Sequence, residues 1–307
     1  MEHLGDITEM HGGSIKPAHI ITFGSPCQDM STIGLREGLG GKESGLFYQA
    51  IRIIDEMRLA TNGEFPVWAV WENVMGAFSS GKRMDFKRVL EAFTKSAVPM
   101  PRSARWAYAG LVRGRLPDIA WRLMDARYWG VPQRRRRIFL VADFTAERSS
   151  RILFKPRRMF QATQPRPEMW HYSAKGNRVS ASETWWELPT LKPFSQRGMR
   201  SAAKLGNTKK FARCFGLSTD PFPTLLASGG GNYFSLWQGE NYQDGLIRNL
   251  TPIECERLFG LPDGWTEYGA NGEEISRNAR YKALGNAIVL PCAEYVLSGI
   301  KEVSTNA

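Results

Sequence analysis

Short strand-like runs alternate with helix-like segments over the first 150 residues, and this alternation limits the chain to a small set of folds. Strands are expected in three apolar runs, residues 19–24, 65–74 and 135–144. Helices are expected where apolar residues recur every three or four positions, at residues 45–60, 85–97 and 119–130. The alternation favours an α/β domain built on a parallel sheet, and we expect that domain to occupy residues 1–150.

The pattern changes in the second half of the chain. Residues 151–245 are dominated by Gly, Ser, Pro, Trp and basic residues and show little periodicity. Order returns at Thr251, a helix N-cap whose capping box is completed by Glu254. We therefore expect a smaller, irregular, mainly β domain over residues 151–275, and a C-terminal helix over residues 276–307 that returns to the first domain.

Basic charge is concentrated in this second region. The chain holds 41 Lys/Arg against 30 Asp/Glu, and residues 151–245 alone hold 14 against 6. Such an excess either solubilises a surface or attracts a polyanion. Tryptophans are interleaved with the basic residues, at positions 170, 185, 186 and 237. This combination favours nucleic acid as the partner.

Cysteine usage and hydropathy indicate the environment. The four cysteines are Cys27, Cys214, Cys255 and Cys292. They include no CxxC pair, so neither a metal site nor a disulfide framework is expected. The chain has no run of about 18 or more apolar residues that would predict a membrane span. Its first residues lack an apolar signal region. We expect a reducing, cytoplasmic context.

A single thiol follows the first expected strand. The string GSPCQ places Cys27 directly behind Pro26, which rigidifies the turn. Open α/β sheets bind ligands at the carboxyl ends of their strands, and an ionised cysteine is a strong nucleophile. The alternative is a small buried thiol, since free cysteines are often buried.

The second expected strand ends in a carboxylate. Glu72 lies just past the apolar run, at the same predicted edge as Cys27, and is either a helix cap or a functional acid. Its neighbour Asn73 could orient the loop. A nucleophile and an acid on neighbouring strand ends form a candidate catalytic constellation.

Four consecutive arginines precede the third expected strand. Side chains alternate along a strand, so Arg135 and Arg137 are expected on one face. Together they could hold Glu72 and hydrogen-bond a substrate carbonyl. Arg134 and Arg136 are expected on the other face, as solvated charges.

Taken together, these strings resemble the DNA cytosine-5 methyltransferase family. GSPCQ is similar to its Pro-Cys catalytic loop, ENV to its Glu-Asn-Val motif and QRRRR to its Gln-x-Arg-x-Arg motif. RNLTPIECERLFGLPDGW and ALGNAIVLP resemble its ninth and tenth blocks, and GDIT the end of its third. The strings occur in family order along almost the whole chain. The resemblance implies a partial Rossmann-like, S-adenosylmethionine-dependent methyltransferase sheet over residues 1–150, with target recognition over residues 151–275.

The resemblance also implies a role for each matching residue. Cys27 would add to C6 of a cytosine flipped out of duplex DNA, and Glu72 would contact N3 and the exocyclic amine. Arg137 would bind the cytosine O2, and Arg135 would support the catalytic loop. The implied cofactor-binding residues are Asp6, Pro26, Leu46 and Asn286. The implied substrate-binding residues are Gln28, Asn73 and Gln133.

The chain departs from the family at its start, where the Phe-x-Gly-x-Gly block and the following acidic residue are not found. We expect the first strands of the domain to be missing. The chain would then be a truncated gene product, one half of a split enzyme that needs a complementary segment, or a remnant that binds DNA without catalysis. Double-stranded DNA is the implied partner, with a cognate restriction endonuclease as a second. An RNA cytosine methyltransferase is the other alternative, although the long recognition region argues for DNA.

Overall fold

The computed structural model describes residues 2–25, 46–114, 116–131, 133–155, 191–195, 222–225, 234–238 and 246–305. These residues belong to two compact units. Unit 1 comprises Met1–Met124, Arg136–Lys155 and Val296–Ala307, and unit 2 comprises Asp125–Arg135 and Pro156–Tyr295. Three of the predicted site residues, Pro26, Cys27 and Gln28, lie outside the described residues, as does most of the basic region.

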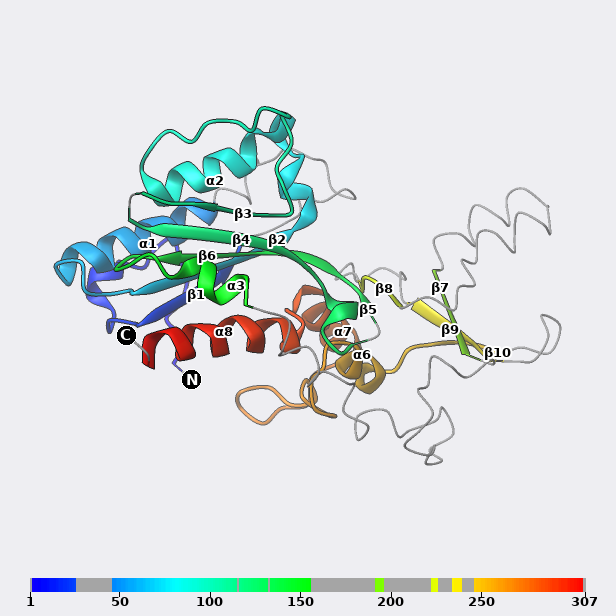
Figure 1. Cartoon of the computed structure of the whole chain (residues 1–307). Coiled ribbons are helices and arrows are strands. Elements are labelled where there is room, and N and C mark those ends of the chain that lie inside the picture. Colours follow the sequence, from blue (N-terminus) through cyan, green and yellow to red (C-terminus); the bar gives the residue numbers. More distant parts are fainter. Residues whose placement is uncertain are drawn as a thin grey trace. The chain divides into compact units, whose positions relative to one another are not determined.

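Unit 1 is built on a five-stranded mixed sheet (Figure 1). In spatial order the strands are β1 (Ile20–Gly24), β2 (Trp68–Val74), β6 (Arg136–Asp143), β4 (Asp118–Asp125) and β3 (Ala109–Val112). Strands β1 and β2 are parallel, whereas β6 is antiparallel to β2 and β3 is antiparallel to β4. The predicted α/β class is confirmed, but the sheet is not wholly parallel as predicted, because the β2–β6 and β3–β4 pairs are antiparallel.

The predicted helix at residues 119–130 is wrong. This stretch forms β4 and a short 3-10 helix, η5 (Ala126–Tyr128). The first four side chains of β4 are all buried. Burial of consecutive side chains removes the alternation by which a strand is recognised, and a continuous apolar run cannot be told from a buried helix by periodicity. A strand, β4, takes the place of the expected crossover helix, so the chain enters β6 from the opposite end of the sheet to β2. Strand β6 therefore runs antiparallel to β2.

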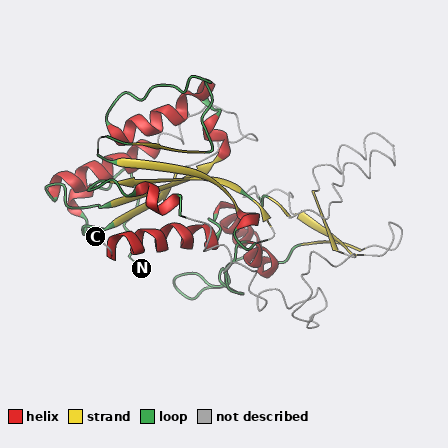
Figure 2. Cartoon of the chain, in the orientation of Figure 1, coloured by secondary structure: helices red, strands yellow, loops and turns green. Residues whose placement is uncertain are grey.

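Helices cover both faces of the unit 1 sheet (Figure 2). The helices α1 (Leu46–Ala60) and α2 (Met84–Thr94) lie on one face, and both fall close to the residue ranges predicted to be helical. On the other face lie α3 (Ser149–Leu153) and the C-terminal part of α8 (Leu290–Thr305). The core under α1 and α2 is aromatic: Trp71 and Phe86 are fully buried, with ring centroids 6.3 Å apart. Burying such a side chain stabilises the fold by roughly 1.5–3 kcal/mol.

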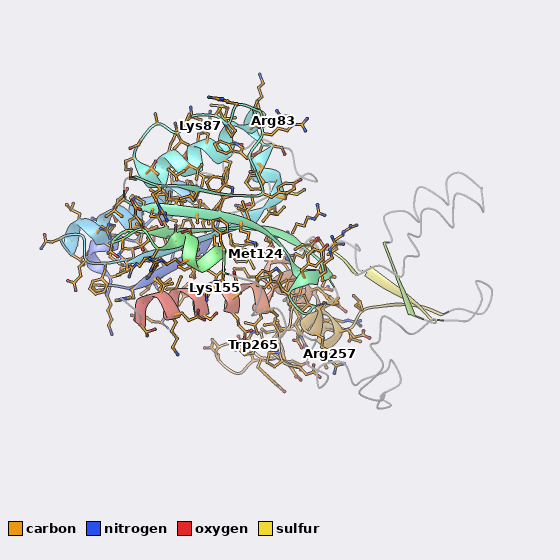
Figure 3. The ribbon with its side chains drawn as sticks, in the orientation of Figure 1. Arg83, Lys87, Met124, Lys155, Arg257 and Trp265 are labelled. Carbon is orange, nitrogen blue, oxygen red and sulfur yellow. The ribbon has the colours of Figure 1, made fainter. Side chains whose placement is uncertain are left out.

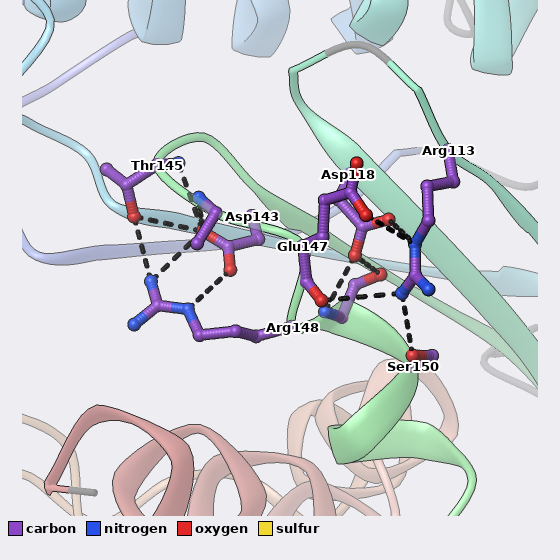
Figure 4. Close-up of polar contacts among 9 residues, drawn as sticks. Arg113, Asp118, Asp143, Thr145, Glu147, Arg148 and Ser150 are labelled. Carbon is purple, nitrogen blue, oxygen red and sulfur yellow. Dashed lines mark hydrogen bonds and ion pairs between the residues drawn. The ribbon is translucent and has the colours of Figure 1, made fainter. Parts of the chain in front are cut away.

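Two buried carboxylates fix the far end of the sheet, where β6 ends (Figure 4). Asp143 accepts from Arg148 Nε at 2.8 Å, and Asp118 accepts from the backbone N–H of Ser149 at 2.9 Å and from Arg113 Nε at 3.2 Å. Both aspartates are fully buried, and a buried carboxylate is costly unless it is paired and hydrogen-bonded in this way. They anchor α3 and the turn before it.

In unit 2 the structure describes several short strands, further helices and the start of α8. The strands β7 (Leu191–Ser195), β9 (Phe234–Gln238) and β10 (Leu246–Asn249) form an antiparallel sheet, and β5 (Gln133–Arg134) pairs with β8 (Phe222–Pro223). Among its described residues, Pro252–Leu258 form α6 and Arg277–Asn286 form α7. Helix α6 begins with the predicted capping box, in which Thr251 Oγ1 accepts from the N–H of Glu254 at 3.2 Å and the Glu254 carboxylate accepts from the N–H of Thr251 at 2.8 Å.

Among the described helices, none alone is long and apolar enough to cross a membrane. The bent pair of α7 and α8 together has the length and composition of a membrane span, and only these two properties point to one. In the same part of the chain, no three or more His, Cys, Asp or Glu side chains gather in a way that could hold a metal ion. Cys255 and Cys292 are buried and form no disulfide bond with each other. Burial is the main cause that raises the pKa of the Cys255 thiol far above its ordinary value, so this thiol is unreactive.

Candidate functional site

Glu72 lies near the carboxyl end of β2, where it meets Arg137 of β6. In the strand register Glu72 is opposite Phe139, two residues from Arg137, so both charged side chains project from the same face of the sheet. Arg137 Nε is 2.9 Å from Glu72 Oε1. The two side chains are 15% and 14% exposed, so water screens the ion pair only weakly. Arg137 therefore fixes the position of the carboxylate, as the arginine run suggested.

Gly24 ends β1 directly beside Glu72. The two residues are partners in the β1–β2 register. A Cβ atom at position 24 would lie 3.4 Å from Glu72 Oε2, so the carboxylate rests against the glycine backbone. The chain continues from Gly24 into Ser25, Pro26 and Cys27. The exit of β1 and the carboxylate of β2 thus lie at one edge of the sheet.

Asn73 holds Ser25 in place. Its side chain is almost fully buried, and Nδ2 donates to Ser25 Oγ at 2.7 Å and to the Ser25 carbonyl at 3.2 Å. Trp71 Nε1 donates to the same hydroxyl at 3.1 Å. The Asn73 carbonyl oxygen accepts from the N–H of Val74 at 2.7 Å. The Asn73 amide is therefore engaged in orienting the residue just before Pro26, and this position fits loop support rather than substrate contact.

Arg135 lies elsewhere than expected. Strand β5 ends at Arg134 and β6 begins at Arg136, so Arg135 interrupts the extended run and belongs to unit 2. The expectation that Arg135 and Arg137 share a strand face is wrong, because alternation requires an unbroken strand. Arg135 is 3% exposed. Its guanidinium donates to the carbonyls of Leu225, Gly285 and Ala287 at 3.1, 3.0 and 2.9 Å, and it lies 5.0 Å from the ring centroid of Phe259.

These contacts of Arg135 fix the end of α7. The Gly285 and Ala287 carbonyls flank Asn286, the last residue of α7, whose side chain is exposed. The other end of α7 is held by Glu256, which the sequence reading missed. Glu256 is fully buried and accepts from Arg280 Nη2 at 2.9 Å. The sequence pattern of α6 predicts which of its residues are buried, but it does not predict that Glu256 pairs with Arg280.

Asp6 lies on an exposed turn before β1. Its carboxylate accepts from the backbone N–H of Thr8 at 2.8 Å and from the Thr8 hydroxyl at 2.8 Å. These bonds, the backbone one first, lower the pKa of Asp6, so the group remains ionised near neutral pH. Leu46, at the start of α1, is partly exposed. An ionised acceptor and an accessible apolar side chain are groups that could meet the amine and the apolar surface of a nucleoside.

A clamp on α1 holds the segment that carries Asp6, and the sequence reading missed it. Arg52 donates to the carbonyls of Ile7 and Met10, both at 2.8 Å. Glu56 accepts from the N–H of Gly12 at 2.6 Å and pairs with Arg52 at 2.8 Å. A Cβ at Gly12 would lie 2.2 Å from a backbone oxygen of α1, so only glycine allows this approach. The only sequence signal was the opposite charge of Arg52 and Glu56, four residues apart, and such a pair usually indicates no more than stabilisation of its own helix.

Gln133 is fully buried in β5. Within the described residues neither its side-chain oxygen nor its nitrogen has a hydrogen-bond partner. A buried amide without partners is costly.

The family model for C-5 cytosine-specific DNA methylases matches residues 1–302. The chain belongs to this family. Three relatives illustrate the range of named methylases that it resembles. The DNA N-6-adenine-methyltransferase of Escherichia phage P1 is 25% identical, covering 96% of this chain and 54% of the relative. The type II methyltransferases M2.BsuMI of Bacillus subtilis strain 168 and M.HhaI of Haemophilus parahaemolyticus are 25% and 24% identical, covering 95% and 96% of this chain and 61% and 80% of the relatives.

Two solved methyltransferase structures have a fold similar to that of this chain. The S. pombe Dnmt2 methyltransferase superposes with a TM-score of 0.56 at 14% identity, over 97% of this chain and 83% of that one. A candidate DNA modification methyltransferase encoded within an E. coli prophage gives a TM-score of 0.56 at 15% identity, over 98% and 85%. The chain therefore has the mixed α/β fold of these two structures, and it spans 54% and 61% of the length of the phage P1 and M2.BsuMI relatives.

Proposed function

We propose that the protein is a DNA cytosine-5 methyltransferase, which transfers a methyl group from S-adenosylmethionine to C5 of a cytosine in duplex DNA. The observation that carries the proposal is the Glu72–Arg137 pair beside Gly24. It holds a carboxylate at the sheet edge from which the chain continues to Cys27. Membership of the C-5 cytosine-specific DNA methylase family supports the reaction class.

In the proposed reaction Cys27 is the nucleophile. Its thiolate forms a bond to C6 of the cytosine, and Glu72 contacts N3 and the exocyclic amine, which stabilises the electron density that moves toward C5. Arg137 donates to the cytosine O2 while its Nε remains on Glu72. Once C5 carries the methyl group, water takes the C5 proton and the electrons of that C–H bond form the C5–C6 double bond. The Cys27–C6 bond breaks at the same time, and its electrons return to sulfur, which restores the aromatic ring and the thiolate.

The residues assigned to the cofactor are compatible with S-adenosylmethionine. When bound, the cofactor supplies an electrophilic methyl group. The ionised carboxylate of Asp6 would accept a hydrogen bond from the adenine amine, and Leu46 would offer apolar contact. The other two residues of the proposed set are Pro26 and Asn286, an exposed residue whose chain neighbours Gly285 and Ala287 accept hydrogen bonds from Arg135.

The proposed substrate is double-stranded DNA from which the target base is flipped out. Unstacking a base costs a few kcal/mol, and contacts with phosphates can offset that cost. The basic residues of the 151–245 region would supply part of these contacts and the sequence readout, with Gln28 and Gln133 supporting the flipped state. Because several relatives are named type II methyltransferases, we further propose a role beside a cognate restriction endonuclease.

The proposal is tested by methyl transfer from labelled S-adenosylmethionine to mixed-sequence duplex DNA. The modified bases are then identified by mass spectrometry of the nucleosides. We expect 5-methylcytosine with the unaltered chain, none with Cys27→Ser, and at least a 100-fold lower rate with Glu72→Gln, about the lower limit for loss of a general acid–base group. N6-methyladenine as the product, or full activity of the Cys27→Ser variant, would refute the proposal.

A further inference from the structure

A cluster of basic side chains follows the strand that carries Glu72. The basic cluster consists of Lys82, Arg83, Arg102 and Arg105. It lies in residues 79–108, which hold seven Lys/Arg and two Asp/Glu. Both acidic residues are already paired, Asp85 with Arg88 at 3.1 Å and Glu91 with Lys87 at 3.5 Å. The four cations of the cluster form no ion pair with any described residue. The cluster is therefore an uncompensated positive surface.

Two hydrogen bonds join the two halves of the basic cluster. Arg83 Nη1 donates to the carbonyl of Ala104 at 3.0 Å, and Trp106 Nε1 donates to the carbonyl of Arg83 at 2.9 Å. Figure 3 shows Arg83 beside the start of α2. The loop that carries Arg102 and Arg105 is thus fastened to the turn that carries Lys82 and Arg83, and all four cations lie in one region of unit 1.

The local structure of the cluster is unfavourable for folding. Lys82 and Arg83 have φ values of +53° and +72°, a left-handed conformation that residues other than glycine rarely adopt. They also stand directly before α2, an 11-residue helix whose dipole disfavours cations at its start. A face that only interacts with water requires neither feature. The first turn of α2 already holds the buried carboxylate of Asp85, so it is the four cations, and not the helix dipole, that favour an anion at this place.

The basic cluster flanks the edge of the sheet that carries Glu72. Strand β2 ends at Val74, and the 3-10 helix η3 (Met75–Phe78) leads into the cluster and α2. Phe86 in the first turn of α2 packs on Trp71, the residue before Glu72. The start of α2, with its cations, therefore lies at the same end of β2 as the carboxylate.

We propose that the basic cluster binds the phosphates of duplex DNA on either side of the target cytosine. The inference rests on the DNA substrate of the proposed function, and it assigns a second DNA-binding surface outside the basic region at 151–245. Charge complementarity identifies the occupant: a spaced set of unpaired cations fits a repeating phosphate backbone. Contacts of this kind position the duplex over the catalytic edge and carry no sequence information.

The test compares two double variants in binding to a fluorescein-labelled, mixed-sequence 30-base-pair duplex over a series of salt concentrations. The first is Arg102→Gln with Arg105→Gln, chosen because both side chains are exposed and neither donates a hydrogen bond to a described residue. The control is Lys16→Gln with Lys301→Gln, which removes the same charge from exposed positions outside the cluster. Thermal unfolding checks that both variants fold.

We expect the first variant to bind roughly 10-fold more weakly at moderate salt, and its salt-dependence slope to fall by about 2, since each lost phosphate contact removes about 0.9. The control variant keeps most of the affinity. If both variants lose the same affinity and slope, the inference is wrong, because the effect is one of net charge. If the first variant loses affinity for structured RNA but not for the duplex, the inference is also wrong.

The assay separates this inference from the proposed catalytic function. A wild-type chain that transfers no methyl group but binds the duplex through Arg102 and Arg105 would refute the catalytic proposal and support the DNA-binding surface. A chain that transfers the methyl group, and whose duplex binding is unchanged by the loss of Arg102 and Arg105, would support the catalytic proposal and refute the DNA-binding surface. Absence of any duplex binding would refute both.

Discussion

Arg137 reaches diagonally across the β2–β6 ladder to Glu72, with 2.9 Å between Nε and Oε1. Strand β2, which carries Glu72, is parallel to β1 and antiparallel to β6, which carries Arg137. The position of the carboxylate therefore depends on the correct register of β2 and β6. A one-residue slip would turn either side chain to the other face. The geometry of this edge is therefore set by the sheet rather than by a loop.

Replacing Arg137 by glutamine should reduce methyl transfer with little change in DNA binding. The variant leaves the Glu72 carboxylate without its charged partner on β6, and a displacement of about 1 Å in a catalytic group can lower a rate by about 100-fold. We expect a fall of that size in kcat, measured with labelled cofactor at saturating DNA. Arg136→Gln, one residue away on the opposite face, is the matched control and should retain activity. Equal losses in the two variants would show that the pairing with Glu72 is not the cause.

Enlarging Gly24 should displace the Glu72 carboxylate. A Cβ at this position lies 3.4 Å from Glu72 Oε2, which is ordinary contact, so alanine fits while the two methyl groups of valine reach further toward the carboxylate. We expect Gly24→Ala to retain most of the activity and Gly24→Val to lose at least about 10-fold, with the unfolding midpoint of both near that of the wild type. Equal activity of the alanine and valine variants would contradict the contact.

Local sequence signals predicted the elements of this protein well and its long-range contacts poorly. The strand ending at Gly24, the helix beginning at Leu46 and the capping box at Thr251 were all predictable, because each depends on neighbouring residues. The direction of β6 was not predictable, because it follows from whether residues 119–130 cross over as a helix or return as a strand. Burial on both faces removes the periodicity that would distinguish the two.

The candidate site shows the same division. Glu72 and Arg137 could be paired from the strand alternation that places them. Arg135 could not be placed, because its partners, the carbonyls of Leu225, Gly285 and Ala287, are 90 or more residues away in the chain. Backbone carbonyls carry no sequence signal, so an arginine that binds them is indistinguishable from a solvated one until the fold is known.

Arg135→Lys should impair both stability and cofactor binding. An ammonium group cannot reach three carbonyls as the planar guanidinium does, and a buried carbonyl left without a donor costs about 1–3 kcal/mol. Because two of these carbonyls flank Asn286, we expect the KM for S-adenosylmethionine to rise by about 10-fold, near 1.4 kcal/mol. Thermal unfolding and steady-state kinetics measure the two effects.

A variant destabilised elsewhere separates these two effects of Arg135→Lys. Asp143→Asn weakens the buried ion pair with Arg148 at the far end of the sheet and should lower stability by up to about 3–5 kcal/mol. Its KM for the cofactor should be unchanged at a temperature where the variant is folded. If this variant raises KM as much as Arg135→Lys does, the effect of Arg135 is one of general stability.

Glu56 should make the stability of unit 1 depend on pH in the acidic range. Burial opposes ionisation of Glu56, but the hydrogen bond from Gly12 and the pair with Arg52 outweigh it, so the pKa of this carboxyl lies below its ordinary value of 4.5. A pKa lowered by folding stabilises the folded state above the unfolded pKa, and this stabilisation is lost as the pH falls through the folded pKa. The clamp on the Asp6 segment should therefore be intact above about pH 5 and weaken below pH 4.5.

Urea unfolding of the wild type and of Glu56→Gln over pH 3–7 measures this dependence. We expect the wild type to be more stable by roughly 1.5–3 kcal/mol above pH 5, the range for a hydrogen bond to a charged group, and the difference to shrink as the pH falls. His11 lies 3.9 Å from the Glu56 carboxylate, so a His11→Asn background removes the other titratable group in the contact. A stability difference that stays constant with pH in that background would show that the charge of Glu56 does not hold the segment.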